Sequence, residues 1–206
     1  MLSNLLLLNY GMLGSGFLGE TNNFNNYQNL LTDNKKTLNN SNMNEIKNTI
    51  SNKKTNKQSN TKSLQECYNS FLSDARSNGI DIAVFVHDDV FINTSDLRTR
   101  LVNASEKFSV FGLAGATTCK ISNPALWHLM SKREDQRGSV AHGTATSYQY
   151  TSFGPLPSRC LLIDGVFIGI DIETLPDTVK FDESYPSKFH YYDLDFCLEC
   201  NKEGVI

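Results

Sequence analysis

The stretch of residues 82–89 constrains the fold of this chain more than any other part of it. Residues 82–86 are five consecutive apolar residues, and His87, Asp88 and Asp89 follow them directly. A continuous apolar run of this length is typical of a strand that is buried on both faces, as in a parallel sheet covered by helices. The polar triplet then lies at the carboxyl end of the strand, where open α/β sheets bind their ligands.

Asp88 and Asp89 are adjacent carboxylates, and each disfavours ionisation of the other. A divalent cation removes that repulsion. The triplet therefore predicts a metal-assisted site for a phosphate-bearing substrate, with a solvated turn between strand and loop as the alternative.

The composition of the chain excludes several classes of protein. The formal net charge of -3 argues against a general nucleic-acid binder, so no nucleic-acid partner is expected. No apolar run approaches the roughly 20 residues of a membrane-spanning helix, so no transmembrane segment is expected either. Five cysteines scattered through apolar segments predict buried free thiols in a reducing compartment. The expected location is therefore cytoplasmic, either free or peripheral to a membrane.

Two regions of different composition divide the chain. Residues 1–62 are rich in asparagine, lysine, serine and threonine, and such a segment buries too little apolar surface to fold. We therefore expect a largely disordered leader, in which residues 5–8 could form a first strand. Ser63 and Glu66 have the spacing of a capping box, so an ordered α/β domain is expected over residues 63–206.

Apolar periodicity places further elements along this domain. The helix that begins after Ser63 stops near Gly79, which suits a left-handed C-terminal position. Residues 117–158 show no clear period, so they are interpreted as a long binding loop or as elements that the pattern conceals. The other expected elements are a helix after Thr94 or Ser95, strands at 109–116, 160–163 and 166–170, and a helix at 193–201.

Acidic residues stand at the ends of three of these elements. They are Asp88 with Asp89, then Asp164, and then Asp193 with Asp195. Loops at strand ends converge on one crevice, so these acids are expected to share a site. Carboxylate oxygens suit Mg²⁺ or Mn²⁺, and a further carboxylate can act as a general base.

Three motifs carry a resemblance to a known family. Residues 87–90 resemble the DxD-type metal motif of glycosyltransferases with the GT-A fold, residues 164–167 resemble their "DG" segment, and residues 181–197 are similar to their late "fde…yDvDlc" stretch. The resemblance implies a GT-A-like, Rossmann-like domain with a mixed, mainly parallel sheet flanked by helices. Family members continue beyond the last helix, so it also implies a chain that is incomplete at its C-terminus.

The resemblance also implies roles for individual residues. Asp193 falls on the catalytic base of inverting members, and Asp89 is the expected metal ligand because His87 occupies the first DxD position. The remaining candidates are His87 and His190 at the metal, and Asp88, Asp164, Gly165, Trp127 and Asp195 at the substrate. For Asp164 and Gly165 a tight turn is the competing interpretation, and for Trp127 it is a place in the core.

The expected reaction is transfer of a sugar from a nucleotide-diphospho-sugar to a hydroxyl group of a glycan, a lipid-linked or a protein acceptor, with inversion and with Mn²⁺ or Mg²⁺. One alternative is a degenerate domain that binds nucleotide-sugars or has a structural role. The other is a metal-dependent phosphohydrolase.

Overall fold

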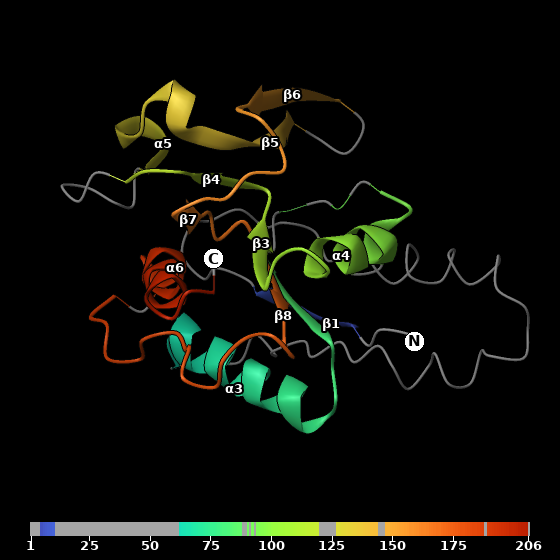
Figure 1. Cartoon of the computed structure of the whole chain (residues 1–206), viewed down its shortest axis with the longest axis vertical. Coiled ribbons are helices and arrows are strands. Elements are labelled where there is room, and N and C mark those ends of the chain that lie inside the picture. Colours follow the sequence, from blue (N-terminus) through green and yellow to red (C-terminus); the bar gives the residue numbers. More distant parts are fainter. Residues whose placement is uncertain are drawn as a thin grey trace, which may run out of the picture.

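The computed structural model describes the backbone of residues 5–10 and residues 62–87, 90, 92, 94–119, 127–143, 147–187 and 189–205, with the backbone alone at 130. These residues form a mixed α/β fold with two four-stranded sheets (Figure 1). Asp88, Asp89 and most of the expected leader lie outside the described residues.

The first sheet contains the strand expected at residues 82–86. Its order is β1 (Leu5–Tyr10), β2 (Ile82–His87), β8 (Phe167–Asp171) and β3 (Val110–Gly112). Residues 5–8, for which a strand and a frayed terminus were both open, lie in β1, which pairs in parallel with β2. The expectation of a mainly parallel sheet is wrong, because β8 runs antiparallel to both β2 and β3. An apolar run shows that both faces of a strand are covered, but it does not show the direction of the neighbouring strands.

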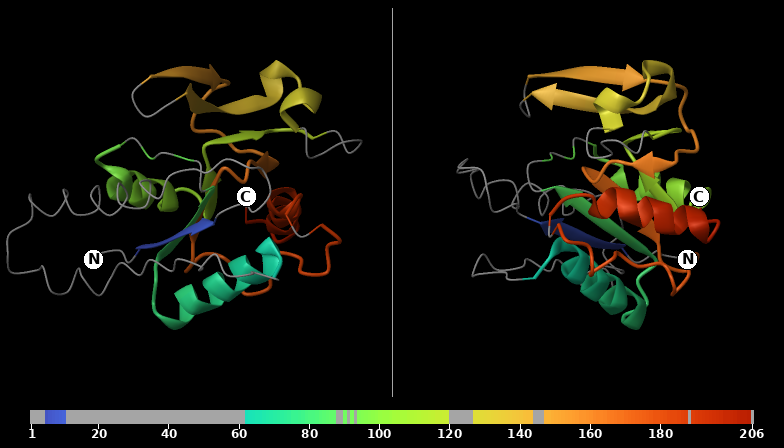
Figure 2. Two further views of the ribbon diagram at one scale, coloured as in Figure 1. Left: turned by 180° about the vertical axis from the view of Figure 1, so that it is seen from behind. Right: turned by 90° about the vertical axis from the view of Figure 1, so that its left-hand side faces the viewer.

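The second sheet is antiparallel throughout. Its order is β6 (Tyr148–Phe153), β5 (Gln136–Gly143), β4 (Ala114–Ala116) and β7 (Leu162–Ile163). The strand expected at residues 109–116 is split at Leu113 into β3 and β4, which belong to different sheets. The expected long loop is also corrected, since it contains α5 (Trp127–Met130) and the β5–β6 hairpin. Figure 2 shows this hairpin on the side of the molecule away from α3.

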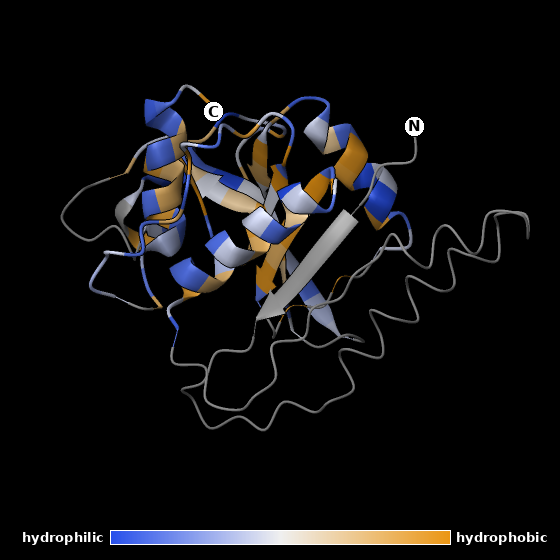
Figure 3. Ribbon diagram, turned by 90° about the horizontal axis from the view of Figure 1, so that it is seen from below, coloured by the Kyte–Doolittle hydropathy of each residue, from blue (hydrophilic) through white to orange (hydrophobic). Residues whose placement is uncertain are grey.

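Side chains of β2 alternate between two apolar clusters, which explains its continuous apolar sequence. Ala83 and Phe85 pack with α3 (Leu64–Ser77) in the larger cluster. Ile82, Val84 and Val86 pack with Leu101 of α4 (Leu97–Ser105) on the other face. Figure 3 shows the hydrophobic residues of these central strands between the helices.

Helix α3 begins as the sequence predicts. Glu66 N–H donates to Ser63 Oγ at 3.2 Å, and Ser63 N–H donates to Glu66 Oε2 at 2.7 Å, so both halves of the capping box are present. These bonds satisfy donors that the first helical turn leaves without partners.

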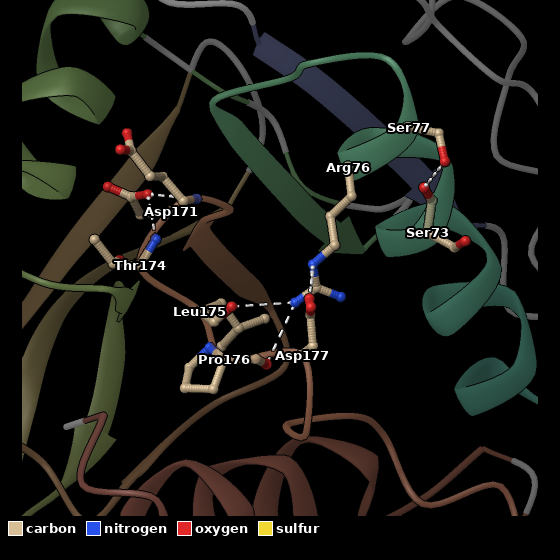
Figure 4. Close-up of polar contacts among 9 residues, drawn as sticks. Ser73, Arg76, Ser77, Asp171, Thr174, Leu175, Pro176 and Asp177 are labelled. Atoms are coloured by element: carbon tan, nitrogen blue, oxygen red, sulfur yellow. Dashed lines mark hydrogen bonds and ion pairs between the residues drawn. The ribbon is translucent and has the colours of Figure 1, made fainter.

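One side of α3 holds the segment that leads to the last helix. Gln65 Nε2 donates to Ser187 O at 2.9 Å, and Asn69 exchanges two hydrogen bonds with the backbone of Phe181, at 2.8 and 3.0 Å. Arg76 donates to the carbonyl oxygens of Leu175 and Pro176 (Figure 4). Helix α3 thereby fixes the path of residues 175–187.

The last helix, α6 (Tyr192–Lys202), packs against an aromatic core. Phe181 stacks on Phe196 of this helix with ring centroids 4.2 Å apart, and Tyr68 stacks on Phe85 at 4.3 Å. All five cysteines are free thiols, as expected, but only Cys197 and Cys200 on α6 are buried, and the other three are partly exposed. Among the described helices, none has the length and apolar character needed to cross a bilayer.

Candidate active site

One cavity gathers most of the residues that the sequence singles out. It has a volume of about 180 Å³ and lies where β2, α3, α5, the turn after β7 and the start of α6 meet. Its described lining residues are Leu64, Tyr68, His87, Trp127, Asp164, Phe189, His190, Tyr191, Tyr192, Asp193 and Leu194. None of these is a lysine or an arginine, so the lining offers imidazoles but no permanent positive charge.

Asp164 is fixed in this cavity by two donors. Trp127 Nε1–H donates to Asp164 Oδ2 at 2.8 Å, and Val166 N–H donates to Asp164 Oδ1 at 2.9 Å. Asp164 N–H in turn donates to Ala114 O of β4 at 2.8 Å. Asp164 therefore lies in a tight turn, which was the alternative to a functional role, and it is also held by the side chain of Trp127 from α5.

Asp193 lies in the first turn of α6 and is also held by backbone donors. Gly165 N–H donates to Asp193 Oδ2 at 2.8 Å, and Leu194 N–H donates to Asp193 Oδ1 at 3.0 Å. Burial raises the pKa of this carboxyl group, and the negative charge of Asp164 raises it further, against the lowering effect of the two N–H donors. A carboxylate with a raised pKa is a better proton acceptor than an exposed aspartate.

A tyrosine connects the end of β2 with this turn. Tyr192 Oη lies 2.9 Å from His87 Nε2, and it donates to Gly165 O at 3.4 Å. Gly165 has no side chain at a point of close approach, because a Cβ atom there would lie 2.1 Å from Tyr192 Oη.

The residue before α6 has an unusual backbone conformation. Tyr191 has φ = 67°, in the left-handed region that non-glycine residues seldom occupy. Its neighbour His190 is exposed, lines the cavity, and is held by its backbone N–H, which donates to Ser187 Oγ at 2.9 Å. Backbone strain of this kind is often found at functional sites.

The structure brings together five of the predicted site residues, namely His87, Trp127, Asp164, His190 and Asp193. Gly165 contacts Asp193 through its backbone N–H. Asp195 is not part of the described lining. The pKa of Asp195 is raised by burial and by the negative charges of Asp182 and Glu199. Asp88 and Asp89 lie outside the described residues.

The described residues do not form a metal centre by themselves. No group of three histidine, cysteine, aspartate or glutamate side chains among them is arranged to hold a metal ion. His87 Nε2 is engaged by Tyr192, and all four carboxylate oxygens of Asp164 and Asp193 accept hydrogen bonds from the protein. A bound cation would therefore need further ligands from outside the described residues.

Sequence reasoning missed the aromatic residues of the site. Tyr68, Phe189, Tyr191 and Tyr192 line the cavity but were not candidates. Four of the residues before Asp193, at positions 189–192, are aromatic or histidine, and this density of rings beside an acid is the signal that could have identified them.

Fold and cavity together define an α/β domain with two fixed carboxylates in one aromatic-lined pocket. The chain matches the family model described as "Glycosyltransferase like family" over residues 16–206 and belongs to this family. The resemblance to family 2-like glycosyltransferases of the GT-A type is thereby confirmed, and the domain belongs to a class of proteins that transfer sugars. No curated protein matches the chain. The match begins before Ser63, so the predicted domain boundary stays a prediction.

Proposed function

We propose that this domain transfers a sugar from a nucleotide-diphospho-sugar to an acceptor hydroxyl group, with inversion and with Asp193 as the base. The observation that carries this proposal is that Asp164 and Asp193, distant in sequence, line one cavity, and that the pKa of Asp193 is raised. A raised pKa brings a carboxyl group nearer to the value that favours proton transfer at neutral pH.

The proposed step follows from these positions. Asp193 accepts the proton of the acceptor hydroxyl group while that oxygen forms a bond to the anomeric carbon. The bond from this carbon to the nucleoside diphosphate breaks, and the diphosphate leaves with the electron pair. Asp164, held by Trp127 and Val166, orients the sugar or the acceptor. The aromatic residues exclude water, which competes with the acceptor.

The proposal includes Mn²⁺ or Mg²⁺. When bound, such an ion neutralises charge that develops on the departing diphosphate. The absence of lysine and arginine from the described lining supports this part of the proposal, because the diphosphate then needs another source of positive charge. Asp89 would hold the ion, with His87 and His190 as the nearby imidazoles. We expect that a chelator abolishes transfer and that added Mn²⁺ or Mg²⁺ restores it, as measured by release of nucleoside diphosphate.

Asp193→Asn tests the assignment of the base. Loss of a general base lowers turnover by about 10²- to 10⁴-fold. Binding of the donor, measured by thermal shift with a panel of nucleotide-diphospho-sugars and Mn²⁺, should change little. Asp177→Asn is the matched control, because the Asp177 side chain is 90% exposed and outside the cavity. Full turnover by Asp193→Asn would contradict the proposal.

A domain that only binds nucleotide-sugars is the second candidate, and the hydrogen bonds that already occupy both carboxylates favour it. It predicts a thermal shift with one nucleotide-diphospho-sugar but no transfer by the unaltered protein. A phosphohydrolase would release phosphate without an acceptor, and no cluster of three metal-binding side chains among the described residues supports it.

A further inference from the structure

The side chain of Tyr192 lines the cavity and contacts residues from two other segments. Its hydroxyl group has one proton, and donation to Gly165 O at 3.4 Å uses it. His87 Nε2 lies 2.9 Å from the same oxygen, and the donor in this second hydrogen bond depends on the His87 tautomer. With either tautomer, the hydroxyl group joins the end of β2 to the turn that contains Gly165.

Packing holds the Tyr192 ring in place. The residue is 6% exposed, and its ring meets that of Tyr68 edge to face, with centroids 5.4 Å apart and an interplanar angle of 90°. On the other side, a Cβ atom at Gly165 would lie 2.7 Å from Tyr192 Cζ, so the turn fits closely around the ring.

The two segments that Tyr192 joins carry different parts of the proposed reaction. His87 ends β2, and the next residues in the sequence are Asp88 and Asp89, the expected metal-side acids. Gly165 belongs to the turn that carries Asp164, and its N–H is bonded to Asp193 Oδ2. Tyr192 itself directly precedes Asp193 at the start of α6.

We propose that Tyr192 is a positioning residue whose hydroxyl group holds the end of β2 and the Asp164–Gly165 turn at a fixed separation, and so aligns the donor with the base Asp193. This inference rests on the proposed function for its catalytic consequence. Its geometric content, a link from His87 through Tyr192 to Gly165, stands on the contacts alone.

Tyr192→Phe removes the linking oxygen and keeps the packed ring. Small misalignment of reacting groups can cost about 100-fold in rate, so we expect kcat to fall by about 10- to 100-fold. The dissociation constant of the nucleotide-diphospho-sugar, measured with Mn²⁺, should stay within about threefold, since the aromatic packing is unchanged. A residue with only a structural role would instead lower the melting temperature and the active fraction, with kcat per active site unchanged. Tyr148→Phe, on the β5–β6 hairpin, is the matched control and should keep full kcat.

A second measurement tests the link from His87 through Tyr192 to Gly165 and does not require sugar transfer. Amide hydrogen exchange at Gly165 and Val166, in the full chain without donor or metal, reports how firmly the turn is held. Exchange should accelerate in Tyr192→Phe. It should stay slow in His87→Gln, whose amide reaches the position of Nε2, and accelerate in His87→Asn, whose shorter amide does not.

The outcomes separate this inference from the proposed function. If the unaltered protein transfers no sugar to any acceptor, the proposed function fails, and amide exchange still decides whether Tyr192 holds the turn. If the unaltered protein is active and Tyr192→Phe keeps its kcat, the inference is overturned while the proposed function stands. Unchanged exchange at Gly165 in Tyr192→Phe overturns the inference in either case.

Discussion

Asp164 and Asp193 lie in the same cavity, but their surroundings differ. Asp164 accepts from an indole N–H and a backbone N–H. Among the described residues, the donors to Asp193 are backbone N–H groups, and its pKa is raised first by burial and then by the charge of Asp164. Two acids placed close together in different environments can take different roles, since their ionisation is separated.

The raised pKa of Asp193 predicts a pH dependence of stability. Because the folded protein binds this proton more tightly than the unfolded chain, the stabilisation is complete below the unfolded value, 3.8, and is lost as the pH rises through the raised folded pKa. Urea unfolding of the unaltered protein and of Asp193→Asn, at pH values from below 3.8 to above the folded pKa of Asp193, measures this stabilisation. The free energy of unfolding of the unaltered protein should fall relative to the variant as the pH rises. If the unaltered protein instead gains stability relative to Asp193→Asn as the pH rises, the raised pKa of Asp193 is contradicted.

At the scale of elements, helix α3 connects the core with the segment that leads to the site. Its buried apolar side packs on β2, while Gln65, Asn69 and Arg76 bind backbone groups between residues 175 and 187. These side chains share one side of the helix because their spacing follows the helical period. The helix therefore positions the segment that leads to His190 and Asp193, while its residues in the cavity lining, Leu64 and Tyr68, are uncharged.

Asn69→Ala should destabilise the protein by about 2–3 kcal/mol, because it leaves buried backbone groups of Phe181 without partners. Ser77→Ala on the same helix removes only an exposed hydrogen bond to Ser73 O, visible in Figure 4, and should cost less than about 0.5 kcal/mol. Chemical denaturation of both variants checks the difference. Equal losses would show that Asn69 does not anchor the segment.

Elements with a strong local signal could be predicted from the sequence. The capping box located α3, the apolar run located β2, and the spacing of Leu194, Cys197 and Leu198 located α6. The split at Leu113 could not be predicted, because β3 and β4 form one continuous apolar stretch and only tertiary pairing assigns them to different sheets. Strand β5, with two glycines and a mixed pattern, carries little periodicity.

At the scale of the whole molecule, the cavity lies where the two sheets and α6 converge. His87 comes from the first sheet, and Asp164 follows β7 of the second. Of the acids expected to converge, Asp164 and Asp193 share the cavity and Asp195 is not in its described lining, although the rule behind the prediction concerns parallel sheets and β7 is antiparallel to its neighbour. The contacts of Trp127 and Tyr192 could not be predicted from the sequence, because no residue near either one in the chain indicates its partner.

Gly115→Ala should reduce activity from outside the cavity. Gly115 of β4 lies opposite Ile163 of β7, and a Cβ atom there would lie 2.2 Å from Leu162 O. Because β7 must shift, Asp164 shifts with it, and we expect turnover to fall by about 10-fold or more with a loss of about 1–3 kcal/mol in stability.

Gly79→Ala is the matched control. Gly79 has φ = 62° with no atom near the position of a Cβ, so this variant should lose stability but keep its turnover. Equal turnover of Gly115→Ala and the unaltered protein, in assays of sugar transfer, would contradict the dependence of Asp164 on the second sheet.

The hydrogen bond between Trp127 and Asp164 has a practical consequence. Trp127 is the only tryptophan of the chain, and its indole N–H is bonded to a carboxylate of the cavity. The emission of this indole is therefore a natural optical probe of the site. Any molecule that competes for Asp164 should change the wavelength or intensity of that emission. Ligands can therefore be screened in unlabelled protein before any reaction product has been identified.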